Sequence, residues 1–194
     1  SALFTVGLGV YGLKKWMHEH RGKEAFTLIK SLIKESHRMN RACSTLRERV
    51  RSSERRIFSH SERQNFTNNE IWKITEKEAF DRRFEAFISA DSSYRDALLD
   101  ARAALGSHIY GAFLDFGKHI TKNVVSVNQY LDQVLSEDFV YTSDEDPILL
   151  EFQDTFLISP AHRESDQLAT QTMDAREEGE KALLSYLGRK SIRG

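Results

Sequence analysis

The sequence predicts an all-α fold: an antiparallel bundle of three long helices plus a shorter C-terminal helical pair, preceded by an apolar N-terminal helix. The first 146 residues contain no proline, because Pro147 and Pro160 both lie near the C-terminal end, and proline disrupts helix interiors. Apolar residues recur at intervals of three and four, the spacing of one helix face. The β-branched residues of 123–127 fall within such a period, so no strand is predicted.

The apolar N-terminal helix is predicted from residues 2–13 (ALFTVGLGVYGL), which carry no charge. Lys14, Lys15 and Trp16 follow at once, and lysine and tryptophan are favoured at a membrane–water interface. We therefore expect residues 1–16 to anchor the chain to a membrane. A spanning helix needs about 20 apolar residues, so two interpretations are open: more apolar residues precede Ser1, or the segment only dips into the membrane.

The basic flank lies on the C-terminal side of the apolar segment, which places residues 17–194, the helical bundle, in the cytoplasm at the inner membrane. If residues 2–13 are instead buried within the bundle, the protein is cytoplasmic.

A heptad seam predicts one continuous helix through Phe58. The seam positions are Ile29, Leu32, Ser36, Met39, Cys43, Leu46, Val50, Ser53 and Ile57.

The first third of the chain is basic. Residues 14–63 carry 14 basic and six acidic residues, a net charge of +8, in a chain whose net charge is −1. Either this basic third attracts the acidic helices of the same bundle, or it offers a basic face to anionic lipid or nucleic acid.

Local signals divide the rest of the chain. Residues 60–69 are polar, and Thr67 with Glu70 forms a capping box for the next helix. Gly106 with Ser107 either ends that helix and starts the third, or the helix runs through. After an acidic loop at 137–147, Asp146 caps a short helix that begins at Pro147, and Ser159–Pro160 repeats this signal before the last helix.

Four arginines, Arg47, Arg51, Arg55 and Arg56, are the candidates for binding a polyanion or a protein partner. Within a continuous helix Arg47, Arg51 and Arg55 share one face. The alternative is a helix end whose arginines are solvated or paired within the molecule.

Asp91 interrupts the apolar seam of the second long helix and is the candidate buried polar residue. A buried carboxylate needs a partner, for which Arg47 and Arg102 are the candidates.

No metal or cofactor site is predicted. None of the seven histidines has a carboxylate three residues earlier, and no H-E-x-x-H sequence occurs. Cys43 lies on the apolar seam, where a cysteine behaves as a small hydrophobe. Phosphate-binding loops and nucleophile elbows are also missing from the sequence, and no catalytic residue is predicted.

The first quarter of the chain resembles a pattern in uncharacterised bacterial proteins that have a short N-terminal membrane helix, a juxtamembrane tryptophan and a cytoplasmic helical domain. The resemblance implies an inner-membrane anchor and no enzymatic activity. It is carried by Lys14–Lys15–Trp16, Glu19, Gly22–Lys23, Ala25, Leu32–Ile33 and Arg47.

These features favour a non-enzymatic, membrane-anchored helical protein that acts through protein–protein contacts, as a scaffold, sensor or effector subunit. Its partners would be the membrane, through residues 2–16, and another protein or further copies of the chain. The alternative is a soluble helical module that binds nucleic acid or another polyanion through its basic helix, residues 47–63. An enzyme with a dispersed site around Asp91 is the third hypothesis.

Overall fold

The computed structural model describes the fold of residues 2–158 and 166–191, and the side chains of residues 22–158 and 166–186. The all-α prediction is confirmed. The described residues form no β-strand, although Glu48 and Ile158 make an isolated β-bridge. The elements are α1 (Ala2–Arg47), the 3₁₀-helix η1 (Ser52–Glu54), α2 (His60–Asn65), α3 (Asn68–Leu105), α4 (Ser107–Ala112), α5 (Leu114–Val134), α6 (Pro147–Phe156) and α7 (Gln167–Ser191).

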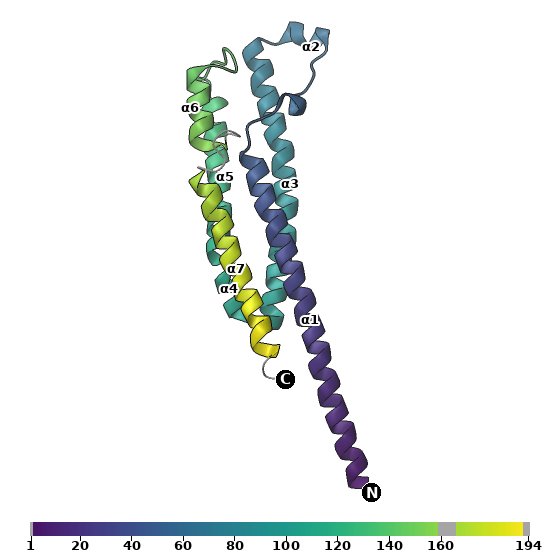
Figure 1. The fold of residues 1–194 in the computed structure, drawn as a ribbon. Helices are drawn as coiled ribbons and strands as arrows, with labels where there is room; N and C mark the ends of the chain where they lie inside the picture. Colours follow the sequence, from purple (N-terminus) through teal and green to yellow (C-terminus); the bar gives the residue numbers. More distant parts are fainter. Residues whose placement is uncertain (1, 159–165, 192–194) are drawn as a thin grey trace.

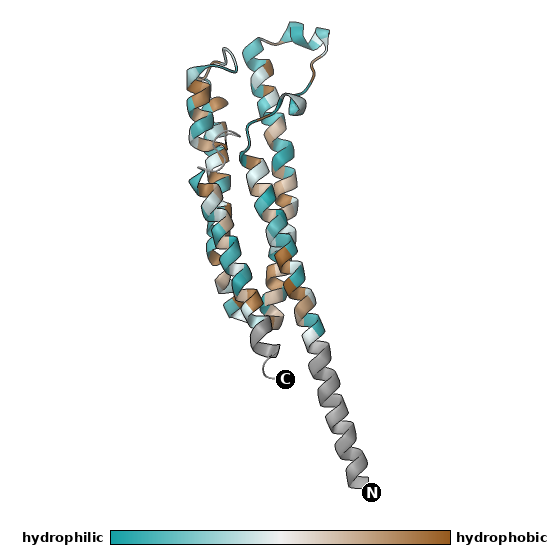
Figure 2. Ribbon diagram, viewed as in Figure 1, coloured by the Kyte–Doolittle hydropathy of each residue, from teal (hydrophilic) through white to brown (hydrophobic). Residues whose placement is uncertain are grey.

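The long helices lie side by side in an elongated molecule (Figure 1). Helix α1 packs along α3, while α5 packs against α6 and α7 and also contacts α1. The N-terminal part of α1 extends beyond the bundle, at the end opposite to α2 and α6 (Figure 1). Figure 2 shows that hydrophilic residues dominate α2 and that apolar positions gather on the bundle helices. In the part of the chain that the structure describes, no helix is both long and apolar enough to cross a membrane.

The heptad seam of α1 is correct as far as Leu46. Its side chains from Ile29 to Leu46 face the core, with exposures of 0–2 %. The predicted continuation to Phe58 is wrong, because α1 ends at Arg47 and Ile57 is 90 % exposed. The backbone carbonyl of Arg47 has a partner outside the helix, because it accepts a hydrogen bond from the amide of Ile158 at 2.7 Å. Tertiary contacts thus replace the hydrogen bonds of a further helical turn.

Two predicted helix starts are confirmed. Thr67 caps α3: its hydroxyl accepts from the Glu70 amide at 3.2 Å, and the Thr67 amide donates back to the Glu70 carboxylate at 2.7 Å. Asp146 caps α6 by accepting from the Ile148 amide at 2.9 Å, with Pro147 as the first helical residue. Both starts depend on neighbouring residues, which explains why the sequence reveals them.

Gly106 ends α3, so the helix does not run through into the next. Its φ of 106° lies in a region that other residues rarely adopt. The predicted start signal at Ser159–Pro160 lies outside the described residues. Helix α7 begins after Asp166, whose carboxylate accepts from the Ala169 amide at 2.7 Å.

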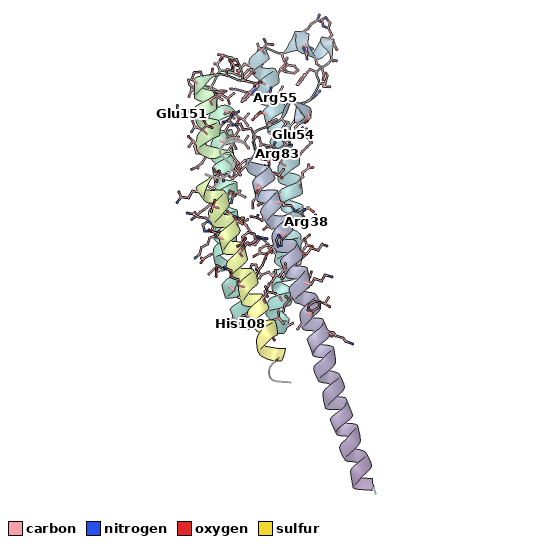
Figure 3. All side chains as sticks on the ribbon, in the orientation of Figure 1. Arg38, Glu54, Arg55, Arg83, His108 and Glu151 are labelled. Carbon is pink, nitrogen blue, oxygen red and sulfur yellow. The ribbon has the colours of Figure 1, made fainter. Side chains whose placement is uncertain are left out.

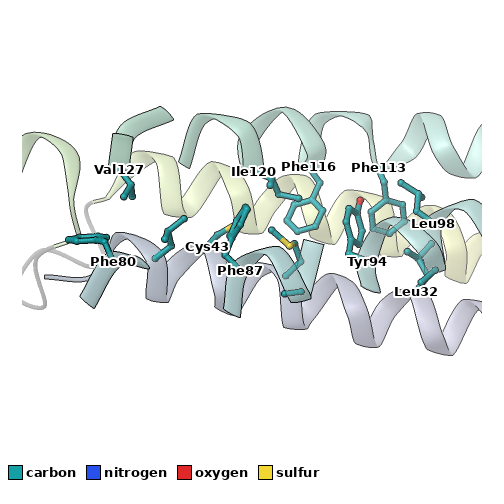
Figure 4. Close-up of a cluster of buried hydrophobic side chains, with 14 of the residues drawn as sticks. Leu32, Cys43, Phe80, Phe87, Tyr94, Leu98, Phe113, Phe116, Ile120 and Val127 are labelled. Carbon is teal, nitrogen blue, oxygen red and sulfur yellow. The ribbon is translucent and has the colours of Figure 1, made fainter. Parts of the chain in front are cut away.

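The third predicted helix is interrupted at Phe113, which separates α4 from α5. Phe113 is 1 % exposed and belongs to an aromatic cluster with Tyr94 and Phe116 (Figure 4). The rings of Tyr94 and Phe116 meet edge to face, with centroids 5.4 Å apart. A β-carbon added at Gly179 of α7 would lie 2.8 Å from the Phe113 ring. Gly179 therefore allows α7 to approach this cluster closely.

We expect Gly179→Ala to destabilise the protein by about 1–3 kcal/mol, because the new methyl group overpacks a buried ring that has little room to move. This cost exceeds the roughly 0.5–1 kcal/mol that alanine contributes over glycine inside a helix. The matched control is Gly117→Ala in α5, where a β-carbon has open space around it, so this variant should gain stability. Denaturant unfolding followed by circular dichroism measures both. Equal stabilisation of the two variants would contradict the packing of α7 on Phe113.

Candidate functional site

The predicted membrane-interface residues lie on the part of α1 that extends beyond the bundle (Figure 1). The side chains of Lys14, Lys15 and Trp16 lie outside the described residues. Their role at a membrane stays a prediction.

Arg47 is buried rather than available at the surface, with 4 % exposure. Its guanidinium donates to both carboxylate oxygens of Asp166, at 3.0 and 2.9 Å. It also donates to the carbonyl of Phe156 at 3.2 Å and to the amide oxygen of Asn123 at 3.5 Å. A planar guanidinium suits such bidentate pairing with a carboxylate. In this position Arg47 connects the end of α1 to α5, to the end of α6 and to the start of α7.

The other candidate arginines each pair with a carboxylate of the same chain. Arg51 bonds Glu48 at 2.7 Å, and Arg55 makes a bidentate pair with Asp144 at 3.1 and 2.9 Å. These pairs agree with the alternative in which the candidate arginines are paired within the molecule.

Arg56 bonds Glu78 at 3.0 Å and also contacts Glu62. The helical face predicted for Arg47, Arg51 and Arg55 does not form, because α1 ends at Arg47. Binding of a polyanion or a partner by these residues stays a prediction.

Arg83, which is buried, forms a second ion pair with the partly exposed Glu54, and the sequence did not reveal this pair. Figure 3 shows the two residues close together beside the segment that follows α1. Arg83 is 7 % exposed and donates to both oxygens of Glu54, at 2.8 and 2.6 Å. It also donates to the carbonyls of Glu48 and Arg49, the latter at 3.1 Å. Arg83 therefore fixes the irregular backbone between α1 and α2.

Glu76 is a buried carboxylate, with 1 % exposure, that accepts a hydrogen bond from the Tyr130 hydroxyl at 2.7 Å. Burial raises the pKa of Glu76 above its ordinary value, although the bond from Tyr130 and the charges of Arg55 and Arg83 oppose this shift. The spacing of Glu76 and Arg83 relative to Phe80 and Phe87 places all four on one face of α3. That spacing was the signal that could have identified both polar residues.

The prediction that Asp91 is buried is wrong, because 23 % of the surface of its side chain is exposed. Its partner is neither Arg47 nor Arg102. Arg95, one turn further along α3, donates through Nε to the Asp91 carboxylate at 2.7 Å. Asp91 borders an open groove between α3 and α5, so solvent and a neighbour on the same helix take the place of a buried partner.

The arginines also lower the pKa of one carboxyl in the acidic loop and of one in the segment before α2. The bond from Arg55 lowers the pKa of Asp144, against the effect of partial burial. Burial alone would raise the pKa of Glu54, but the bonds from Arg83 and from the Arg51 amide outweigh it and lower the pKa. Both carboxylates are therefore ionised at neutral pH, as their ion pairs require.

Within residues 22–158 and 166–186, no three histidine, cysteine or acidic side chains are grouped in a way that would hold a metal ion. No protein-family model matches the sequence, and neither a curated protein nor a solved structure is significantly similar to it.

We expect Glu76→Gln to stabilise the protein at neutral pH by roughly 1 kcal/mol, the lower end of the cost of burying a polar group. Glutamine keeps an acceptor for Tyr130 but carries no charge to desolvate. Because the pKa of Glu76 is raised in the fold above its ordinary value of 4.5, the folded state binds more protons than the unfolded state between these two values. The free energy of unfolding should therefore fall as the pH rises through this interval.

Urea unfolding as a function of pH measures this effect, with Glu85→Gln on the exposed surface of α3 as the control for removing one negative charge. The variant should lose this component of the pH dependence while the control keeps it. A variant that is less stable than the wild type at neutral pH would show that ionised Glu76 is stabilising instead.

Proposed function

We propose that the chain is a non-enzymatic, membrane-anchored helical protein that acts through protein–protein contacts, as a scaffold, sensor or effector subunit. The observation that carries this proposal is the extent of α1 (Ala2–Arg47), one helix that begins in the uncharged segment 2–13 and ends within the bundle. Its N-terminal part extends away from the other helices (Figure 1). Residues 2–16 would contact the inner membrane, and the bundle would face the cytoplasm.

Residues 2–13 alone are long enough to enter one leaflet of a bilayer. Twelve helical residues rise about 18 Å at 1.5 Å per residue, whereas the hydrocarbon core of a bilayer is about 30 Å thick. Lys14, Lys15 and Trp16 follow in the same helix, so the headgroup-favouring residues would lie where the helix leaves the membrane. The continuous helix would then hold the bundle at a fixed distance from the lipid surface.

The bonding of three buried polar side chains supports a structural role for them. Arg47 and Arg83 are paired with Asp166 and Glu54, and Glu76 accepts from Tyr130. Each of these groups contributes to holding helices or connecting segments together. A protein partner, or further copies of the chain, would therefore bind the outer surface of the bundle.

The alternative function, binding of a polyanion through residues 47–63, is supported by the exposure of two arginines. The side chains of Arg51 and Arg56 are 69 % and 41 % exposed. Solvent screens ion pairs at such positions, so a phosphate-rich partner would compete with Glu48 and Glu62 for them. Binding of this kind would weaken steeply as salt is added.

Co-sedimentation of the chain with vesicles of phosphatidylethanolamine and phosphatidylglycerol tests the anchor. The wild type should pellet with the vesicles, and Leu8→Asp/Tyr11→Asp should reduce binding at least tenfold, because a charge within the apolar segment must be moved out of water. The matched control is Ile88→Asp/Leu184→Asp, which adds the same two charges at exposed apolar positions of the bundle and should bind like the wild type.

A wild-type chain that stays in the supernatant would rule out the anchor. If it then binds a nucleic acid with a steep salt dependence, and Arg51→Glu/Arg56→Glu abolishes this binding, the alternative function is the correct one.

A further inference from the structure

A groove of 390 Å³ lies between α3 and the α4–α5 segment, away from the arginine-rich end of the bundle. Its volume falls in the range of small-molecule sites in proteins, roughly 300–1,000 Å³. Leu98, Phe113 and Ile120 form its buried floor, and the half-exposed Leu99 and Leu114 form its edges. These side chains offer an apolar body a surface that is already in place.

One residue in the wall of the groove, Gly117, has no side chain. Gly117 lies on α5 facing the groove, and a β-carbon added there would meet nothing within 4 Å. Glycine is unfavourable inside a helix relative to alanine, by roughly 0.5–1 kcal/mol. The helix therefore keeps open space where most other residues would fill it.

Tyr94 supplies an unused hydrogen-bond donor in the same groove. The residue is 3 % exposed, and among the described residues its hydroxyl has no hydrogen-bond partner. In Figure 4 the Tyr94 ring lies between Phe113 and Phe116, with its hydroxyl directed toward α5. Burial, and then the nearby charge of Asp91, raises the pKa of Tyr94, so the hydroxyl keeps its proton. Leaving such a buried donor unpaired costs about 1–3 kcal/mol.

Two cations border the groove on opposite sides. Arg95 of α3 bonds Asp91 through Nε, which leaves the terminal amino groups of its guanidinium for a second partner. Lys118 of α5 pairs with Asp115 at 2.7 Å, and both of these side chains are more than 60 % exposed. Asp91 is the one carboxylate among the residues that line the groove. Each cation is thus paired with one carboxylate, and the terminal amino groups of Arg95 are the charged donors that remain for an anion.

We propose that this groove binds a small amphipathic anion: a molecule with one apolar chain or ring and one carboxylate. The apolar body would cover Leu98, Leu99 and Leu114. The carboxylate would face the guanidinium of Arg95, with Lys118 opposite, and would accept a hydrogen bond from Tyr94 once a shift of the groove wall uncovers the buried hydroxyl. The volume of the groove is in the range of small-molecule sites, which favours a free small molecule as the occupant. This site is independent of the membrane anchor proposed above.

Isothermal titration of the full chain with decanoate, below the micelle-forming concentration, tests the site. The wild type should bind decanoate, and Gly117→Leu should lose binding because the leucine side chain fills the groove. Gly111→Leu is the matched control: a β-carbon at Gly111 also meets nothing within 4 Å, but Gly111 does not line the groove, so this variant should bind like the wild type. Residues 2–13 are also apolar and would offer decanoate a second place to bind. Loss of binding in Gly117→Leu but not in Gly111→Leu would show that decanoate binds in the groove.

Two further measurements test the polar part of the site. Tyr94→Phe should weaken decanoate binding about tenfold, while the stability of the unliganded protein stays the same or rises, since the hydroxyl has no partner to lose. Decyltrimethylammonium, a cation with the same chain length, should bind at least tenfold more weakly than decanoate. Equal binding of decanoate by the wild type and Gly117→Leu, equal binding of the two probes, or no decanoate binding by the wild type would each overturn the proposal.

Discussion

The buried guanidinium of Arg47 is the interaction on which the arrangement of the helices depends most. It binds Asp166 in bidentate fashion and also donates to Phe156 and Asn123, so one side chain at the end of α1 contacts α5, the end of α6 and the residue that caps α7. A charge with 4 % exposure is tolerated only when its donors are satisfied. These partners come from distant parts of the sequence.

Helix α1 is bonded within the bundle at its C-terminal end and extends beyond the bundle at its N-terminal end (Figure 1). The seam and Arg47 hold the C-terminal part of α1 within the bundle. The second ion pair, Arg83 with Glu54, holds the chain after α1 on the surface of α3. The proposed function uses both features: a helix that reaches toward the membrane and a bundle that stays folded as a platform for a partner.

The sequence predicted the features that depend on neighbouring residues and missed those that depend on distant ones. The seam as far as Leu46 and the caps at Thr67 and Asp146 were predicted correctly, because residue spacing or one adjacent side chain determines each. The end of α1 at Arg47 was not predicted, since the seam spacing continues through residues whose backbone is bonded by Arg83 and Ile158. For the same reason the sequence identified the arginines as candidates but could not name the carboxylates that they bind.

A double-mutant cycle on Arg47 and Asp166 tests most directly whether this pair holds α1 in place. Asn is used at position 166 because it can still cap α7, and Met at position 47 because it keeps an unbranched chain. Arg47→Met and Asp166→Asn should each lower the free energy of unfolding by about 3–5 kcal/mol, as expected when one partner of a buried pair is removed. The double variant should lose about 2–3 kcal/mol less than the sum of the two single losses, the coupling energy expected of residues in direct contact. Single variants within about 0.5 kcal/mol of the wild type, or strictly additive losses, would contradict this account.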